Sequence, residues 1–197
     1  MKERGMIFNA EMVRALLDGR KTQTRRPVKF PVHDKNLGCE LAGNELAGEL
    51  SAGNYLNSAF GKPGDRIWVR ETWNKYGGLL TYRADHDWID DMRKETVCTA
   101  KWVPSIHMPR WASRILLEIT DVRVERLNAI SQEDAQAEGM ELTGWRPTYS
   151  DPDGGGEVMT PYDNFAELWS SIYGDESWKA NPWVWVISFK RVEGGAA

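Results

Sequence analysis

The chain has 197 residues, of which 41% are hydrophobic and 27% are charged, and its formal net charge is -4. This balance is ordinary for a folded globular protein and argues against wholesale disorder. No window approaches the roughly 20 apolar residues that a membrane span needs, and the N-terminus lacks the apolar run of a signal peptide. We therefore expect a cytoplasmic protein, folded as a single domain over residues 1–197 with insertions.

The cysteine and histidine content gives no sign of a metal site. Cys39 and Cys98 are too few and too far apart for a disulfide framework, and the three histidines show no ligand spacing with them. We expect neither a metal nor a cofactor. Ten tryptophans are several-fold above ordinary usage, and each is either a core residue, which we favour, or a stacking wall for a base.

The first predicted element is a short helix that opens at Asn9 and ends before Gly19. Apolar residues recur along it with helical spacing, and glycine is the usual residue just past a helix end. The segment Gly19–Arg26 follows, and from Lys21 its alternation predicts a strand that Pro27 ends.

Residues 14–29 reverse the acidic balance of the chain. They carry six cations, namely Arg14, Arg20, Lys21, Arg25, Arg26 and Lys29, against the single acid Asp18. Clustered cations of this kind attract phosphate or another polyanion. The alternative is a solvated basic turn without a ligand.

The middle of the chain predicts loops between strands. Residues 31–64 show little periodicity and read as a surface insertion, and the strand Arg66–Glu71 follows the turn at 62–65. Residues 80–84 and 98–102 predict a hairpin around an acidic connector, and the two prolines of 104–111 predict an extended segment.

The last third predicts one long strand, two helices and a closing strand. Residues 114–127 alternate as a strand, Ser131 caps a helix over 132–138, and 141–160 is another insertion. A helix begins at Thr160–Pro161, and residues 183–192 form the closing strand. Five or six strands with about three short helices predict an α+β fold built on a small curled mixed β-sheet or barrel.

Three polar features could carry chemistry. A lysine such as Lys21 could act as the base for a Thr24 hydroxyl if nearby cations and burial lower its pKa. In a straight strand, however, residues three apart face opposite ways, so the two can meet only if the chain bends. Glu138, in the last helical turn before Gly139, is either a solvated end residue or the partner of a cation elsewhere. The prolyl loop with Ser105, His107, Arg110 and Trp111 could offer a donor and a stacking face, although a lone histidine there is more often structural.

Four segments together resemble the ASCH domain, a relative of the PUA RNA-binding barrel. They are Gly19–Arg26, Pro63–Glu71, Glu133–Gly139 and Trp183–Lys190, and they cover roughly half of the chain. Further runs at 68–73, 106–114 and 181–186 resemble the larger ASCH proteins of phages and prophages. The chain is about twice as long as the small ASCH enzymes, with added segments near 31–60, 72–105 and 141–160 that could change the substrate.

The resemblance implies an activity and a site. Small bacterial ASCH proteins include amidohydrolases that remove the acetyl group from N4-acetylcytidine, and their catalytic residues fall by motif on Lys21, Thr24 and Glu138. By analogy Thr24 attacks the acyl carbonyl, Lys21 carries the proton and Glu138 holds Lys21. The residues that we expect around a modified nucleoside or RNA are Arg20, Thr22, Arg25, Arg26, Trp68, Arg70, Glu71, His107 and Arg110.

Two other functions fit the same sequence. The first is a non-catalytic RNA-binding module, or a ribonuclease, that uses the same basic cleft; its binding would weaken steeply with salt, whereas recognition of an uncharged nucleoside would not. The acidic net charge argues mildly against broad non-specific nucleic-acid binding. The second is a phage accessory protein that acts through protein contacts, with the tryptophans as interface anchors.

Overall fold

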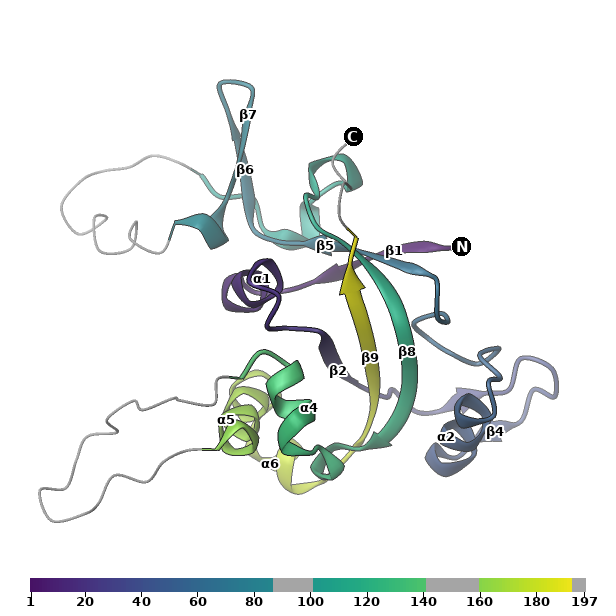
Figure 1. Ribbon diagram of the computed structural model, residues 1–197. Helices are drawn as coiled ribbons and strands as arrows, with labels where there is room; N and C mark the ends of the chain where they lie inside the picture. Colours follow the sequence, from purple (N-terminus) through teal and green to yellow (C-terminus); the bar gives the residue numbers. More distant parts are fainter. Residues whose placement is uncertain (87–100, 141–159, 193–197) are drawn as a thin grey trace, which may run out of the picture. The chain divides into compact units, whose positions relative to one another are not determined.

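The computed structural model describes residues 1–86, 101–140 and 160–192, which form an α+β fold (Figure 1). These residues divide into two compact units. The first takes its residues from 1–19, 62–120 and the end of the chain from 189, and the second from 20–61 and 121–188. The single domain expected from the sequence stays a prediction. None of the helices in the described ranges is long and apolar enough to cross a bilayer.

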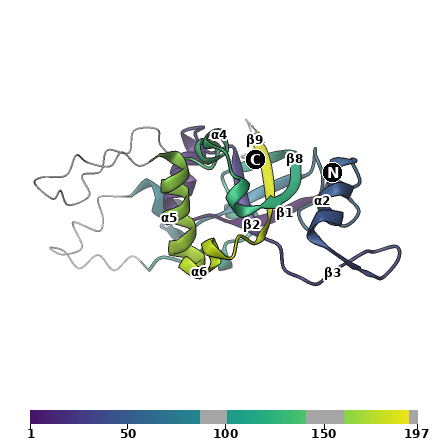
Figure 2. The ribbon, with the colours of Figure 1, turned by 90° about the horizontal axis from the view of Figure 1, so that it is seen from below.

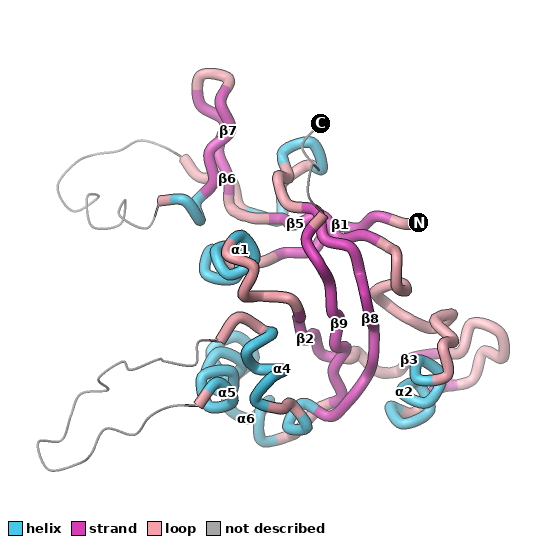
Figure 3. Tube along the Cα trace, viewed as in Figure 1, coloured by secondary structure: helices cyan, strands magenta, loops and turns pink. Residues whose placement is uncertain are grey.

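The largest sheet of the described residues is mixed and has five strands; strands are coloured magenta in Figure 3. Its order is β1-β5-β8-β9-β2, so β1 and β2 are edge strands of an open sheet within the described residues. The prediction of a small curled sheet or barrel was therefore wrong, because the sheet is neither closed nor curled. The sequence analysis also missed β1 (Glu3–Ile7), which adds an edge by pairing parallel to β5 (Arg66–Arg70).

The first unit holds α1 (Ala10–Leu17) and the first half of β8 (Leu116–Arg126). The predicted helix is confirmed at both ends, because the Asn9 side chain accepts a hydrogen bond from the Met12 amide at 2.8 Å and Gly19 follows with φ +75°. The predicted strand at 66–71 is also confirmed, with Ile67 and Val69 buried on one face.

The predicted hairpin of 80–84 with 98–102 stays a prediction, because residues 98–100 lie outside the described ranges. Within those ranges β7 (Leu79–Tyr82) pairs with β6 (Trp73–Tyr76), a hairpin that the sequence analysis missed. The physical reason for this pairing is the Gly77–Gly78 turn, in which both residues have positive φ and so fit a tight two-residue loop. The segment 104–111 was expected to be extended, but it contains 3₁₀ turns at Ser105–His107 and from Arg110.

The second unit pairs β2 (Gln23–Pro27) with β9 (Trp183–Arg191) in antiparallel register, with Arg25 opposite Val186. The helices that pack near this strand pair are α4 (Gln132–Ala137), α5 (Pro161–Tyr173) and α6 (Asp175–Lys179) (Figures 1 and 2). The sequence analysis predicted the first two and missed α6. Phe165 and Trp169 of α5 pack with Val184 and Val186 of β9 in one buried cluster, which fixes the helices over one face of the β2–β9 pair.

The segment 31–64 is not the structureless insertion that low periodicity indicated. It contains β3 (Val32–His33), β4 (Glu40–Leu41) and α2 (Gly43–Ser51). Leu46 and Leu50, one turn apart on α2, are buried, and a β-carbon on Gly43 would overlap the Trp183 ring. Two helical glycines hid the pattern, since glycine lowers helix propensity. The predicted insertion at 141–160 lies almost wholly outside the described residues.

Candidate functional site

The basic segment lies beside the end of α4 in the second unit. Lys21 forms an isolated antiparallel bridge with Glu138, and the Thr22 amide donates to the Ala137 carbonyl at 2.8 Å. Beyond this bridge, β2 alternates its side chains, so Gln23 and Arg25 share one face. These backbone bonds bring together residues that are 117 positions apart in the sequence.

Helix α4 presents two carboxylates toward this face. The Ser131 hydroxyl accepts from the Asp134 amide at 3.0 Å and so caps the helix, as the sequence predicted. Asp134 and Glu138 are four residues apart and therefore lie on the same side of the helix. At Glu138 the helix dipole disfavours a carboxylate, and a neighbouring cation compensates for it.

That cation is Lys21. Its Nζ donates to Glu138 Oε2 at 2.7 Å and to the Glu138 carbonyl oxygen at 2.8 Å. The Lys21 side chain is 0% exposed and that of Glu138 is 3% exposed. Burial lowers the pKa of Lys21 below its ordinary value, and the positive charges of Arg26 and Arg25 lower it further, although the Glu138 carboxylate opposes this. Lys21 is thus more easily deprotonated than a surface lysine.

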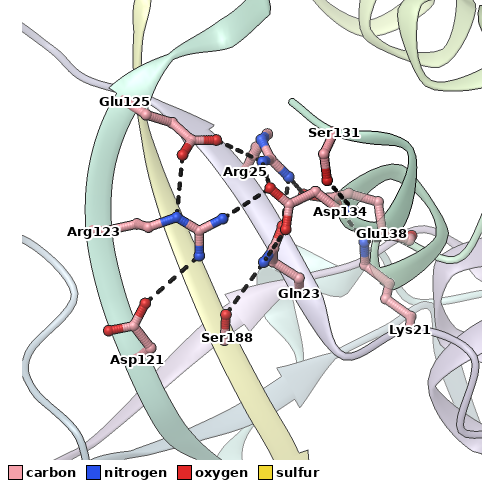
Figure 4. Close-up of polar contacts among 10 residues, drawn as sticks. All are labelled: Lys21, Gln23, Arg25, Asp121, Arg123, Glu125, Ser131, Asp134, Glu138 and Ser188. Atoms are coloured by element: carbon pink, nitrogen blue, oxygen red, sulfur yellow. Dashed lines mark hydrogen bonds and ion pairs between the residues drawn. The ribbon is translucent and has the colours of Figure 1, made fainter. Parts of the chain in front are cut away.

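Arg25 joins the pair to further acids (Figure 4). Its Nη1 lies 3.3 Å from Glu138 Oε1 and donates to Gln23 Oε1 at 2.5 Å. Its Nη2 donates to Glu125 at 2.6 Å and to Asp134 at 2.9 Å. The Glu138 carboxylate is therefore shared by two buried cations, which makes it the central anion of this site.

The outer part of the site is built on the second half of β8. Arg123 donates to Glu125 at 3.1 Å and to Asp134 at 2.9 Å, and it lies 3.6 Å from Asp121. These bonds raise the pKa of Arg123 despite its partial burial. We call the whole set the ionic network, and its charged members are Lys21, Arg25, Arg123, Asp121, Glu125, Asp134 and Glu138.

Asp134 gives a testable dependence of stability on pH. Partial burial opposes its ionisation, but the Arg25 and Arg123 charges and the hydrogen bonds from Gln23 and Arg25 outweigh this and lower its pKa below 3.8. The stabilisation is therefore present above 3.8 and is lost as the pH falls through the lower, folded-state pKa. We expect Asp134→Asn to cost about 1.5–3 kcal/mol in the free energy of unfolding at neutral pH. In urea unfolding at a series of pH values, the difference from the wild type should shrink toward acid. Asp121→Asn serves as the control, because the Asp121 carboxylate is more exposed than that of Asp134. An equal loss in the free energy of unfolding for Asp121→Asn would show that the contacts of Asp134 do not stabilise the protein.

Thr24 does not join this arrangement. It is 2% exposed and pairs with Ile187 on β9, on the face of β2 opposite Gln23 and Arg25. Its hydroxyl makes no hydrogen bond to the residues that the structure describes. The structure thus brings Lys21 and Glu138 together but leaves Thr24 apart, as the alternation of a straight strand requires.

The other predicted residues of the basic segment have separate environments. Arg20 is exposed and its Nη1 donates to the Gly139 carbonyl at 3.1 Å, and Thr22 is exposed as well. Arg25 is internal to the ionic network, with a side chain that is 0% exposed. Arg26 is half-buried and projects from the same face of β2 as Thr24.

The remaining predicted residues belong to the first unit. The Arg70 guanidinium lies 5.4 Å from the centre of the Trp68 ring and donates to the Ile106 carbonyl. Glu71 is buried and accepts from Arg114 at 2.9 Å, and burial raises its pKa even though Arg114 lowers it. His107 is exposed in a 3₁₀ turn, and Arg110 donates to Glu3 at 3.0 Å. The predicted set is therefore divided between the two units.

The sequence analysis missed Gln23, Arg123, Glu125 and Asp134 as members of the site. A signal for them was present. Lys21, Gln23 and Arg25 alternate, Arg123 and Glu125 alternate on the long strand, and Asp134 is one turn before Glu138. Only the backbone amide of Asp134 serves the Ser131 cap, so its carboxylate can bind cations.

Comparisons with known proteins give little beyond this geometry. Neither the models of protein families nor the curated proteins match the chain. Among solved structures, the chain is similar to the protein EF3133 from Enterococcus faecalis V583, described with the family DUF984. The TM-score is 0.42 at 12% identity, over 98% of this chain and 81% of that one. A similarity of this size assigns neither a fold nor an activity.

The chemistry open to this site is proton transfer. A lysine with a lowered pKa can accept a proton and return it, and a carboxylate at hydrogen-bond distance can hold the resulting ammonium in place. Among residues 1–86, 101–140 and 160–192, no group of histidine, cysteine and acidic side chains could hold a metal ion.

Proposed function

We propose that this protein binds RNA or a modified nucleoside and hydrolyses the acyl amide of an N4-acylated cytidine. One observation carries the proposal, namely the buried contact of Lys21 Nζ with Glu138 at 2.7 Å. The ASCH resemblance implies this pairing between two distant segments. A lysine held in this way, with a lowered pKa, suits a group that takes up and returns a proton.

In the proposed reaction the nucleophile is water. The neutral Lys21 amine accepts a proton from water as its oxygen bonds to the acyl carbon. The resulting ammonium, held by Glu138, then returns a proton to N4 as the carbon–nitrogen bond breaks, which yields cytidine and the free acid. Water is favoured over Thr24 because the threonine lies on the opposite face of β2. The reaction also requires that the Lys21 side chain, 0% exposed in this state, becomes accessible to substrate.

Substitution of Thr24 separates the two nucleophiles. We expect wild-type protein to release cytidine from N4-acetylcytidine, and Thr24→Val to retain turnover within a few-fold, because the hydroxyl takes no part. Thr24→Ser, which keeps a hydroxyl, is the matched control. Turnover would be followed by chromatography of the nucleosides. Loss in the valine variant with retention in the serine variant would identify Thr24 as the nucleophile, and no turnover in the wild type would remove the proposal of hydrolysis.

A second candidate is a non-catalytic RNA-binding module. The complete enclosure of Lys21 favours it, because an enclosed ion pair can serve to hold β2 against α4 without touching substrate. In that case the protein binds RNA with a steep dependence on salt and releases no cytidine from the acetylated nucleoside.

A further inference from the structure

A pocket of about 450 Å³ lies at the end of β2 in the second unit, within the size range of small-molecule sites. Two of its lining residues are cations, Arg26 and Lys29, and three are aromatic, Phe60, Tyr173 and Trp185. None of the lining residues that the structure describes is acidic. The combination therefore offers ring surface and positive charge together.

The aromatic walls are held in place by the fold. Trp185 is a strand residue of β9, paired with Arg26, and is almost fully buried. The Phe60 ring meets it edge to face, with ring centres 5.8 Å apart. The loop that carries Phe60 is fixed by Asn57, whose side-chain amide donates to Asp34 at 3.1 Å and to Glu49 at 2.8 Å. A pre-formed pocket of this kind loses little entropy when a ring enters it.

The cations stand at the same pocket but differ in exposure. Arg26 is half-buried on the strand, whereas Lys29 is exposed two residues after the strand ends. An uncharged ring would make no use of the exposed Lys29 charge, and a bare phosphate would make no use of the aromatic walls. A nucleotide satisfies both, because its base stacks on aromatic side chains and its phosphate accepts hydrogen bonds from cations.

We infer that this pocket binds one nucleotide, through its base and its phosphate. The pocket is separate from the ionic network, since Arg26 and Trp185 project from the face of the β2–β9 pair opposite Arg25. The inference therefore goes beyond the proposed hydrolysis, and neither depends on the other.

Calorimetric titration of the full chain with cytidine 5′-monophosphate, cytidine and inorganic phosphate tests this inference. We expect the nucleotide to bind at least about tenfold more tightly than either of its parts. Because this nucleotide has no acyl amide, its binding can succeed or fail whatever the hydrolysis assay gives. Binding of the nucleotide no tighter than that of phosphate would overturn the inference.

Two variants localise the binding. Lys29→Glu should weaken the nucleotide about tenfold and flatten its salt dependence while leaving cytidine unchanged. Phe60→Ala should weaken both cytidine and the nucleotide about tenfold. Lys101→Glu makes the same charge change at an exposed lysine outside the pocket, and it should change nothing. Since Lys29 is exposed, its variant keeps the fold even if Phe60→Ala does not. Equal effects of Lys29→Glu and Lys101→Glu would place the binding elsewhere.

Discussion

Replacing Glu138 by alanine is expected to lower the free energy of unfolding by about 3–5 kcal/mol, the range for removing one partner of a buried ion pair. The loss is large because Glu138 serves two cations. Lys21 and the Nη1 group of Arg25 both bind its carboxylate, and both side chains are 0% exposed. After the substitution, the Lys21 ammonium keeps only its hydrogen bond to the backbone carbonyl oxygen of residue 138. Urea unfolding followed by far-ultraviolet circular dichroism measures the change.

The matched control is Glu133→Ala on the same helix. Glu133 is exposed, so its removal should change the free energy of unfolding by no more than about 0.5 kcal/mol. The double variant Lys21→Met with Glu138→Leu removes both charges and should recover roughly half of the loss or more, because an apolar pair needs no compensation. If Glu138→Ala costs no more than Glu133→Ala, the Lys21–Glu138 contact does not stabilise the protein.

The elements that the sequence predicted well are those with a local signal. The caps at Asn9, Ser131 and Thr160 marked the starts of three helices, and each is observed. The long strand and the closing strand had enough apolar residues to be placed from pattern alone. Local hydrogen bonding and the pattern of apolar residues determine where these helices and strands form, so they could be predicted from one sequence.

The elements that were missed depend on distant partners. β1 is only five residues long and is a strand because β5 lies parallel to it. α2 carries two glycines and is helical because Leu46 and Leu50 reach a buried environment. In each case tertiary packing outweighed local propensity.

The same distinction applies to the candidate site. Chemistry and resemblance pointed to Lys21 and Glu138, and the structure places their side chains at 2.7 Å. The period of a strand predicted that Thr24 faces away, whereas motif resemblance grouped it with Lys21. In the structure Thr24 lies on the face of β2 opposite Gln23 and Arg25, as the strand period predicted. Arg25 was expected at a ligand, but four side chains of the protein itself already occupy its guanidinium. Sequence could place a cation there without showing how many acids surround it.

Lys21→Arg is expected to reduce turnover of N4-acetylcytidine by about 10²–10⁴-fold while preserving the fold. Arginine keeps a positive charge for Glu138, but its guanidinium does not release a proton in the accessible pH range. Wild-type turnover should rise with pH as the Lys21 ammonium is deprotonated, because the neutral amine is the active form. The rise should be centred below 10.5, since burial lowers this pKa. The residual activity of Lys21→Arg should show no such rise.

Steady-state rates across a pH series, with unfolding measured for each variant, test this expectation. Lys190→Arg is the matched control, because Lys190 is exposed, lies 3.0 Å from Glu118 and is not a member of the ionic network. It should leave both the rate and its pH profile unchanged. A folded Lys21→Arg protein with wild-type turnover would show that Lys21 carries no proton, and the contact with Glu138 would then be one that stabilises β2 against α4. A flat pH profile in the wild type would exclude the neutral Lys21 amine as the active form.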